Sequence, residues 1–227
     1  MNVCIQICSK QEWKAFKNIL SIEAGELIAF PYGEYAERRI NNVNCIFFNS
    51  GATVTKASGA AQYAIDNWKP PILIVLGTCG GIGADLVVSD VVIANKTVYF
   101  NCFENEIYLD NIIFKPLTAE IDNSWINWKN LPPFAHEGII ATNDHYGNFE
   151  ASELIKKQNV LCVDWESAAI AYVCSINKIK CCIARGISDL PLKIRDEFLI
   201  NKEYKENTPR IMDSLLKDIL PILLQDI

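Results

Sequence analysis

The sequence predicts an α/β domain in which a largely parallel β-sheet is covered by helices on both faces. Apolar runs of strand length alternate with helix-patterned stretches along the 227 residues. The run Ile72–Leu76 contains no polar residue, which is typical of a strand buried on both faces. No repeat, flexible linker or break in composition divides the chain. We therefore expect one domain that spans residues 1–227.

The first half of the chain is expected to begin with a strand, a helix and three further strands. The helix Glu12–Leu20 is amphipathic, since Trp13 and Phe16 fall on its apolar face. Pro31 and Gly33 mark a turn between two of the strands. A helix of small residues precedes the buried strand, and two more strands follow it. The strands cover Val3–Cys8, Leu27–Phe30, Glu34–Ile40, Cys45–Phe48, Ile72–Leu76, Val91–Ala94 and Thr97–Phe103, and the second helix covers Val54–Asn67.

The second half resumes this alternation after a stretch of weak pattern. In residues 104–134 only a short helix near Trp125 and Trp128 is expected, and it stops before Pro132. Beyond it, apolar runs again alternate with helix-patterned segments. The strands cover Gly138–Ala141, Val160–Val163 and Cys181–Ile187, and the helices cover Glu150–Lys157, Glu166–Ile176 and Arg210–Leu220.

Composition indicates a folded protein and argues against several classes of partner. Half of the residues are hydrophobic and 21% are charged, which excludes an intrinsically disordered chain. The net charge of −6 argues against nucleic acid and anionic membranes, because both bind to basic surfaces. The sequence shows neither a signal peptide nor an apolar run of about 20 residues, the length of a membrane span.

The nine cysteines indicate a cytoplasmic protein. None forms a C-x-x-C pair, so no metal site is expected, and most lie in apolar runs such as those around Cys162 and Cys181. We expect reduced thiols, which are typical of the cytosol. Cys79 is a poor candidate nucleophile, because neither His136 nor His145 lies in a matching motif.

A glycine-rich segment, residues 77–83, follows the buried strand and is expected to form a turn. Counting from Gly81 and Gly83 places Leu86 at the third glycine of G-x-G-x-x-G, so the dinucleotide pattern is absent. No Gly-Lys-Ser/Thr follows, which excludes a Walker A loop. Two interpretations stay open: a ligand-facing loop at the carboxyl end of a strand, or a tight turn whose glycines serve packing.

Two further motifs place carboxylates where buried strands end. The first reads Val-Asp-Trp-Glu-Ser-Ala-Ala-Ile-Ala over 163–171, and the second reads Ile-Ala-Arg-Gly-Ile-Ser-Asp over 183–189. Carboxylates in apolar surroundings are costly unless they bind something. These segments are therefore candidates for a functional site.

With these motifs, the sequence resembles the purine nucleosidase/phosphorylase superfamily, and within it the 5′-methylthioadenosine/S-adenosylhomocysteine nucleosidases. The motifs follow the family's order and approximate spacing nearly end to end: Ser50-Gly51, Gly77–Gly81, Ser89–Ile93, Asp164–Glu166 and Arg185–Asp189. The resemblance implies a three-layer α/β/α sandwich around a mixed, twisted sheet, and a homodimer. It also implies hydrolysis of the N-ribosidic bond of a small-molecule purine nucleoside, with release of adenine and no cofactor, as in methionine salvage.

The resemblance implies catalytic roles for several residues. Cleavage of an N-ribosidic bond needs an acid for the leaving purine, stabilisation of a cationic sugar and an aligned water. Asp189 matches the general acid that protonates purine N7, with Ser188 supporting it, and burial is expected to raise its pKa above about 3.9. Glu12 matches the base that binds the attacking water, and Arg185 would orient Glu12 or this water. Glu166 matches the carboxylate that binds the ribose hydroxyls.

Four further residues match positions against the substrate. Thr78 and Gly77 belong to the glycine-rich segment, where Thr78 would place a hydroxyl near the sugar or the water. Tyr146 falls where the family places an aromatic ring over the purine. Trp165 replaces a usual methionine, and its larger side chain must reshape the pocket.

Each assignment competes with a simpler structural role. Glu12 and Glu166 stand at helix starts, where the helix dipole favours a carboxylate. Asp189 could cap a turn, and Arg185 could pair only with a structural carboxylate. Tyr146 could be a core residue.

The sequence also departs from the family beside the expected 5′ substituent. Leu190-Pro191-Leu192 replaces the usual small and acidic pair after the expected acid. Ser9 and Ala52 stand where the family presents apolar contacts. The 5′ substituent and the base that are accepted therefore stay open.

Phosphorylases of the same superfamily use phosphate instead of water and supply arginines for it. Here Val75 stands two residues before the first glycine of the glycine-rich segment, where one such arginine is found, and it cannot neutralise phosphate. Glu12 would repel phosphate while it suits water, so the sequence favours hydrolysis over phosphorolysis. It is also compatible with a nucleoside-binding protein without turnover, or with an effector that uses residues 104–134 as a partner surface.

Overall fold

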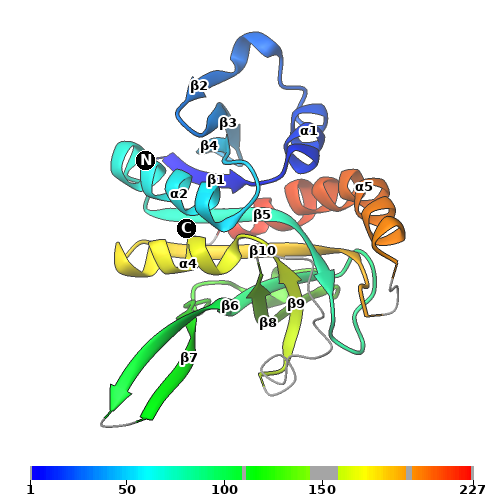
Figure 1. Cartoon of the computed structure of the whole chain (residues 1–227). Coiled ribbons are helices and arrows are strands. Elements are labelled where there is room, and N and C mark those ends of the chain that lie inside the picture. The colour runs from blue at the N-terminus through cyan, green and yellow to red at the C-terminus, as the bar shows by residue number, and fades with distance from the viewer. Residues whose placement is uncertain (1, 109–110, 144–157, 193–195, 226–227) are drawn as a thin grey trace.

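A mixed β-sheet lies between two layers of helices, which confirms the expected sandwich (Figure 1). The computed structural model describes residues 2–108, 111–143, 158–192 and 196–225. Its strands are β1 (Asn2–Ile7), β2 (Ile28–Phe30), β3 (Gly33–Ile40), β4 (Val43–Asn49), β5 (Ile72–Gly81), β6 (Val91–Tyr108), β7 (Asn111–Glu120), β8 (Ala135–Thr142), β9 (Val160–Asp164) and β10 (Lys180–Asp189). Its helices include α1 (Lys10–Ile19), α2 (Val54–Trp68), α4 (Ser167–Ile176), α5 (Glu197–Ser214) and α6 (Leu220–Leu223).

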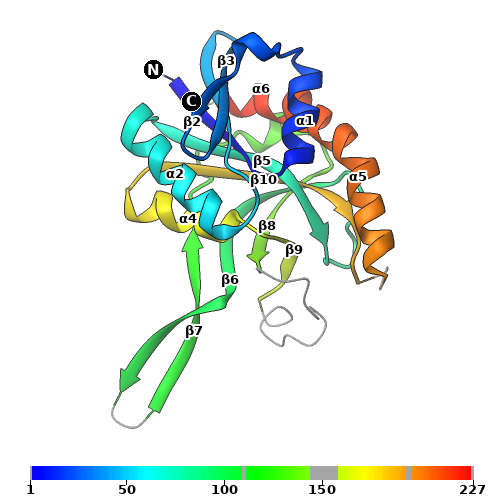
Figure 2. The same cartoon turned by 45° about the horizontal axis from the view of Figure 1, so that its top comes forward.

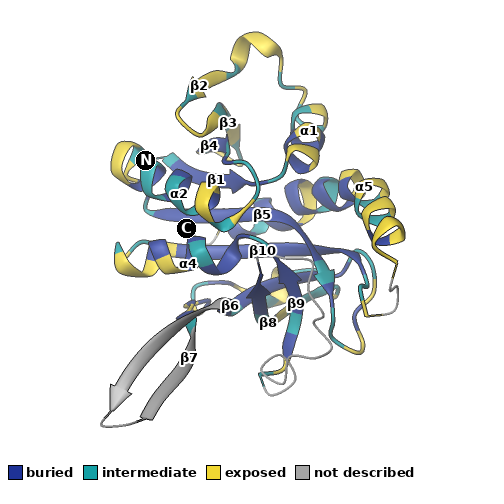
Figure 3. Ribbon diagram, viewed as in Figure 1, coloured by how far each residue is buried: buried dark blue, intermediate teal, exposed yellow. Residues whose placement is uncertain are grey.

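Alternate residues of the central strands face opposite helical layers, because side chains in a strand alternate between its two faces. In β5, Leu73 and Val75 pack in the core beneath α2 and α4. Ile72 and Ile74 pack in the core beneath α1, α5 and α6. Figure 2 separates the pair α2 and α4 from the pair α1 and α5, and Figure 3 shows β5 and β10 buried along most of their length.

The strand order is β10-β6-β8-β9-β5-β1-β4-β3-β2, with β7 paired to β6. Strands β1, β4, β5 and β10 form parallel pairs, whereas β5 with β9 and β10 with β6 are antiparallel. The sheet is therefore mixed rather than largely parallel. Because β10 also pairs with β5, the strands β5, β9, β8, β6 and β10 close into a circuit. This closure brings the ends of β5, β9 and β10 together.

The prediction of a turn over residues 77–83 is wrong, because β5 continues through Gly81. Residues 77–80 pair with β10, in a register that opposes Gly77 to Arg185 and Gly80 to Asp189. Gly81 pairs with Cys162 of β9. Pairing on both sides therefore overrides the low strand propensity of glycine.

Much of the segment 104–134, whose sequence pattern is weak, belongs to a long β-hairpin. Strand β6 is one strand from Val91 to Tyr108, where two were expected, and β7 returns beside it. Figure 1 shows that the hairpin extends away from the sandwich. Only a short 3-10 turn, Trp128–Asn130, replaces the expected helix. Trp125 and Trp128 pack against the core, so they do not form the partner surface of an effector.

The last helix begins earlier than the expected Arg210. Helix α5 starts at Glu197, and Asp196 caps it by accepting hydrogen bonds from two backbone N–H groups. Pro209 lies inside the helix, although proline is typical of a helix start. The expected helix Glu150–Lys157 and Tyr146 lie outside the described residues. None of the helices in the described ranges is long and apolar enough to cross a membrane.

Candidate active site

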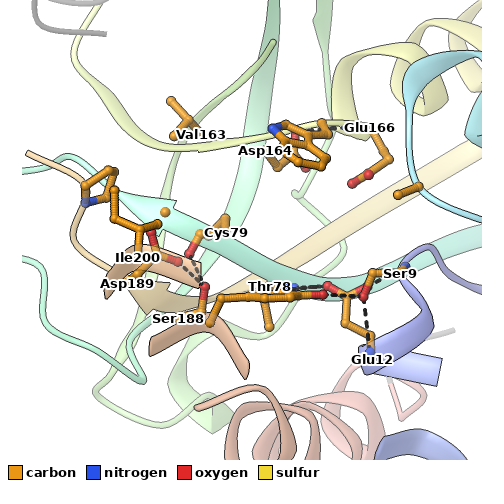
Figure 4. A pocket seen from close by; sticks show the side chains of 15 residues that line it. Ser9, Glu12, Thr78, Cys79, Val163, Asp164, Glu166, Ser188, Asp189 and Ile200 are labelled. Carbon is orange, nitrogen blue, oxygen red and sulfur yellow. Dashed lines mark hydrogen bonds between the residues drawn. The ribbon is translucent and has the colours of Figure 1, made fainter. Parts of the chain in front are cut away.

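A cavity of about 210 Å³ opens where β1, β5, β9 and β10 end (Figure 4). Helix α5 supplies one of its walls. The lining residues are Ser9, Glu12, Ala52, Thr78, Cys79, Gly80, Val163, Asp164, Trp165, Glu166, Ser188, Asp189, Pro191, Ile200 and Tyr204. Parallel strands commonly carry their ligands at this end.

Glu12 is fixed in the wall of the cavity by the start of α1 and by β5. Ser9 Oγ accepts a hydrogen bond from Glu12 N at 3.1 Å, and Glu12 Oε2 accepts one from Ser9 N at 2.8 Å. This capping box holds the carboxylate in place. Glu12 Oε1 accepts hydrogen bonds from Thr78 N at 2.7 Å and Thr78 Oγ1 at 2.8 Å. With 2% of its surface exposed, Glu12 is not a solvated residue of a first helical turn.

Arg185 is fully buried between three carboxylates. Its Nε lies 2.9 Å from Asp164 Oδ2 and 3.1 Å from Ser167 Oγ, and its Nη2 lies 3.2 Å from Glu166 Oε2. Its Nη1 lies 4.0 Å from Glu12 Oε1 and has no hydrogen-bond partner among the described residues. Burial lowers the pKa of Arg185, but the surrounding carboxylates raise it further, so the guanidinium stays charged.

Asp164 organises the turn between β9 and α4. Its Oδ1 accepts hydrogen bonds from Thr142 Oγ1 at 2.7 Å, Ser167 N at 3.2 Å and Glu166 N at 3.3 Å. Ser167 Oγ donates to Asp164 Oδ2, and Thr142 Oγ1 accepts from Ala168 N at 2.9 Å. The carboxylate that holds the guanidinium is thereby fixed from two strands and a helix. The sequence motif contains Asp164 without indicating this role.

Glu166 faces the cavity from the start of α4. Its Oε1 accepts a hydrogen bond from Thr53 N at 3.3 Å, and its other oxygen binds Arg185. Burial raises the pKa of Glu166 to about 8; the charge of Arg185 opposes this shift, and the charges of Asp164 and Glu12 add to it. A positive charge that develops in the cavity would favour the ionised carboxylate.

Asp189 ends β10 in surroundings that favour its protonated form. Burial raises the pKa of Asp189 to about 6. The hydrogen bond from Ser188 lowers this pKa, and the negative charge of Glu203 raises it. Ser188 Oγ lies 2.5 Å from Asp189 Oδ1 and 3.2 Å from the carbonyl oxygen of Cys79. A hydroxyl has one hydrogen. If Ser188 donates it to Cys79, Ser188 Oγ can accept a hydrogen bond from a protonated Asp189.

The strand β5 sets the separation between Asp189 and Glu12. Asp189 pairs with Gly80, whereas Glu12 binds Thr78. Two strand residues correspond to about 7 Å. Inverting glycosidases hold their acid and base at about 6.5–9.5 Å, which leaves room for a water. The positions on β5 that Asp189 and Glu12 contact are thus spaced in the range that an acid and a water-binding base require.

Most of the residues predicted for the site lie together. Those that line the cavity are Glu12, Thr78, Trp165, Glu166, Ser188 and Asp189. Arg185 and Gly77 lie behind the lining rather than in it: a Cβ added to Gly77 would lie 2.1 Å from Arg185 Nη1. Tyr146 lies outside the described residues. Ser9 and Ala52, named for the 5′ substituent, also line the cavity.

Two residues of α5 were missed by the sequence analysis. Ile200 and Tyr204 line the cavity one helical turn apart. Tyr204 Oη donates a hydrogen bond to Ser9 Oγ at 2.8 Å. The four-residue spacing between Ile200 and Tyr204 would place both on one face of a helix. The sequence pattern predicts a helix only from Arg210, so this spacing is not recognised as helical.

Cys79 lies in the cavity wall as a neutral thiol. Its Sγ lies 3.6 Å from the carbonyl oxygen of Gly186. Burial and the neighbouring Cys162 raise the pKa of Cys79 well above its ordinary value. Since the thiolate is the nucleophile, Cys79 is unsuited to nucleophilic catalysis. The eight cysteines with described side chains are all buried and form no disulfide among themselves.

The sandwich and the carboxylate-lined cavity at its strand ends fit one class of proteins. Residues 7–220 match the family described as the Phosphorylase superfamily, and the chain belongs to it. This finding confirms the resemblance to the superfamily.

Within this superfamily, the chain is similar to nucleosidases. The 5′-methylthioadenosine/S-adenosylhomocysteine nucleosidase of Geobacillus sp. (strain WCH70) is 26% identical over 180 residues, which cover 74% of this chain and 78% of that protein. The protein of the same name from Staphylococcus haemolyticus (strain JCSC1435) is 26% identical over 206 residues, 84% of this chain and 89% of that protein.

Solved structures share the fold over almost the whole chain. The nucleosidase of this name from Campylobacter jejuni has a TM-score of 0.72 at 20% identity, covering 96% of this chain and 97% of that one. The futalosine hydrolase of Helicobacter pylori strain 26695 has a TM-score of 0.78 at 17% identity, and the match covers 99% of this chain and 98% of that one. At these identities the likeness shows the fold alone.

Proposed function

We propose that this protein hydrolyses the N-ribosidic bond of purine nucleosides, releasing adenine from 5′-methylthioadenosine or S-adenosylhomocysteine. The names of its relatives support this reaction. The observation that carries the proposal is the pair formed by Asp189 and Glu12 across the cavity. The Asp189 carboxyl has a raised pKa and suits an acid, and the Glu12 carboxyl accepts three hydrogen bonds from Ser9 N, Thr78 N and Thr78 Oγ1.

In the proposed reaction, Asp189 gives its proton to N7 of the purine. The bond between C1′ and N9 breaks, and its electron pair leaves with the purine, which the added proton neutralises. The ribose becomes cationic at C1′. Glu166 stabilises this cation through its ionised carboxylate, the form that a nearby positive charge favours.

Water completes the proposed reaction from the side of Glu12. Its oxygen bonds to C1′, and Glu12 takes one of its protons. Thr78 and Arg185 help to place this water. The N–H groups of Arg185 Nη1 lack a hydrogen-bond partner among the described residues and lie 4.0 Å from Glu12 Oε1, so they can donate to a molecule held there. Arg185 thus acts as a positioning residue.

Water suits this cavity better than phosphate does. None of its described lining residues is Lys or Arg, and four of them are carboxylates. Arg185 is buried and committed to Asp164 and Glu166. Val75, at the position where phosphorylases carry an arginine, is buried in the core beneath α2 and α4. A phosphate dianion would therefore find no cationic side chain among the described lining residues to neutralise it.

The function is tested by assaying purine nucleosides for release of free base by chromatography, with and without phosphate. We expect Asp189→Asn to lower the rate by about 100-fold or more, the contribution of a general acid. In the unaltered protein the rate should fall as pH rises through about 6, because Asp189 loses its proton there. Equal rates for protein and variant would contradict the assignment. Release that requires phosphate and yields ribose 1-phosphate would contradict hydrolysis.

We further propose that the protein is cytoplasmic and forms a homodimer. Helix α4 supports a self-association surface, since Tyr172 and Ile176 are exposed one turn apart. Sedimentation equilibrium should give twice the mass of one chain, and Ile176→Asp should shift the equilibrium toward the single chain. A single-chain mass at all concentrations would contradict the dimer.

A further inference from the structure

The cavity wall beside Glu12 carries two hydroxyl groups that the proposed chemistry does not use. Ser9 precedes the first turn of α1, and Tyr204 belongs to α5. Both side chains line the cavity. The hydrogen bond from Tyr204 Oη to Ser9 Oγ, 2.8 Å long, joins the two helices at this end. The wall here is polar, although the family resemblance implies apolar contacts.

Ser9 has a donor to spare. Its Oγ accepts hydrogen bonds from Glu12 N at 3.1 Å and from Tyr204 Oη at 2.8 Å. A serine hydroxyl has two acceptor sites and one donor, so its acceptor sites are filled and its own hydrogen remains. With Tyr204 as the donor of their shared hydrogen bond, this hydrogen has no acceptor among the described residues. Because Ser9 lines the cavity, a bound ligand can provide one.

Ser9 lies at the end of the cavity away from Asp189 (Figure 4). Asp189 is opposite Gly80 on β5, whereas the group of Ser9 and Glu12 contacts Thr78. If the purine binds at Asp189, the ribose lies between Glu12 and Glu166. The 5′ carbon is attached to C4′, on the other side of the ring oxygen from C1′. The 5′ substituent therefore extends toward the end that Ser9 forms.

We infer, on the basis of the proposed function, that Ser9 favours nucleosides whose 5′ substituent carries an oxygen or nitrogen acceptor. Adenosine has such an acceptor in its 5′ hydroxyl, and S-adenosylhomocysteine has one in its carboxylate. A thioether sulfur is a weak acceptor, so 5′-methylthioadenosine leaves the Ser9 hydrogen without a good partner. Ala52 also lines the cavity, and its small side chain leaves room for a polar group.

The test compares the binding of adenosine with that of 5′-deoxyadenosine, which lacks only the 5′ hydroxyl. Calorimetry on the Asp189→Asn protein measures binding without turnover. We expect adenosine to bind about five- to tenfold more tightly, the effect of one net hydrogen bond. In Asp189→Asn/Ser9→Gly the two ligands should bind within about twofold of each other. Glycine is chosen because it is nearly as good as serine at the start of a helix.

A matched control replaces a serine outside the cavity. Ser58 lies on α2 and donates only to the carbonyl oxygen of Thr55, so Asp189→Asn/Ser58→Ala should keep the preference for adenosine. Equal affinities in the presence of Ser9, or a preference that survives Ser9→Gly, would overturn the inference. Failure of both nucleosides to bind would overturn the proposed function as well. A preference that depends on Ser9, in a protein that releases no adenine, would uphold the inference and reject hydrolysis.

Discussion

At the scale of single residues, Gly77 determines how closely Arg185 approaches Glu12. The two strands place Gly77 opposite Arg185. A Cβ at Gly77 would lie 2.1 Å from Arg185 Nη1 and 2.8 Å from Glu12 Oε1. The guanidinium cannot move aside, because Asp164 and Glu166 hold its other nitrogens. The glycine here serves a close approach of charged groups, rather than the turn that its sequence context suggests.

We therefore predict that Gly77→Ala lowers both stability and activity. Overpacking of a buried site costs about 1–3 kcal/mol, and displacement of Arg185 or Glu12 should lower base release by about tenfold or more. Urea denaturation and the chromatographic assay measure the two effects. Gly25→Ala is the matched control, because nothing lies within 4 Å of its added Cβ, and it should change stability by less than about 1 kcal/mol. Equal effects of both substitutions would contradict this account of Gly77.

Residue types and family motifs predicted eight of the lining residues, with Ser9 and Ala52 included, but not how they are held. Asp189 and Glu166 follow from short motifs at strand ends. That Asp164 anchors Arg185 depends on a contact between β9 and β10 that sequence spacing does not encode. The fixed position of Glu12 likewise depends on Thr78, which is 66 residues away along the chain.

At the scale of elements, β5 and α5 show where local pattern fails. Glycine has a low strand propensity, so a run of glycines predicts a turn, yet pairing with β9 and β10 extends β5 through it. In α5, few residues of the first turns are buried; Ile200 is the first. A helix with such a sparse apolar face gives little periodicity to detect.

The alternation of strands and helices, in contrast, was predictable throughout most of the chain. Buried strands such as β1 and β5 are continuous apolar runs, and α1 carries a clear apolar face. The hairpin of β6 and β7 was not predictable in this way, because its sequence pattern is weak and it extends away from the sandwich. The closure of the sheet by β10 and β5 is a property of tertiary pairing alone.

At the scale of the whole molecule, the buried acid links stability to pH. The pKa of Asp189 is raised from 3.8 to about 6 in the folded protein. Between these values the folded state holds a proton that the unfolded state has lost, so the free energy of unfolding decreases as pH rises. Above pH 6 the full cost of a buried charge remains. This shift corresponds to roughly 3 kcal/mol at most.

Asp189→Asn should consequently make the protein more stable at pH 8 while it abolishes most of the activity. Asparagine can still accept the hydrogen bond from Ser188 but carries no charge. Thermal unfolding at pH 8 should show a higher midpoint for the variant, and the difference should shrink toward pH 3.5. The control Asp66→Asn alters an exposed carboxylate of α2 and should show no such gain. A variant that is less stable at pH 8 would contradict the burial cost assigned to Asp189.

The hydrogen bond between Tyr204 and Ser9 spans 195 positions of the sequence. The cavity is thus built from segments that lie far apart in the sequence, with Ser9 contributed by the start of α1 and Tyr204 by α5. A chain that terminates before Glu197 lacks Ile200 and Tyr204 and leaves the pocket open along one side. A fragment without α5 should therefore be unable to enclose a nucleoside.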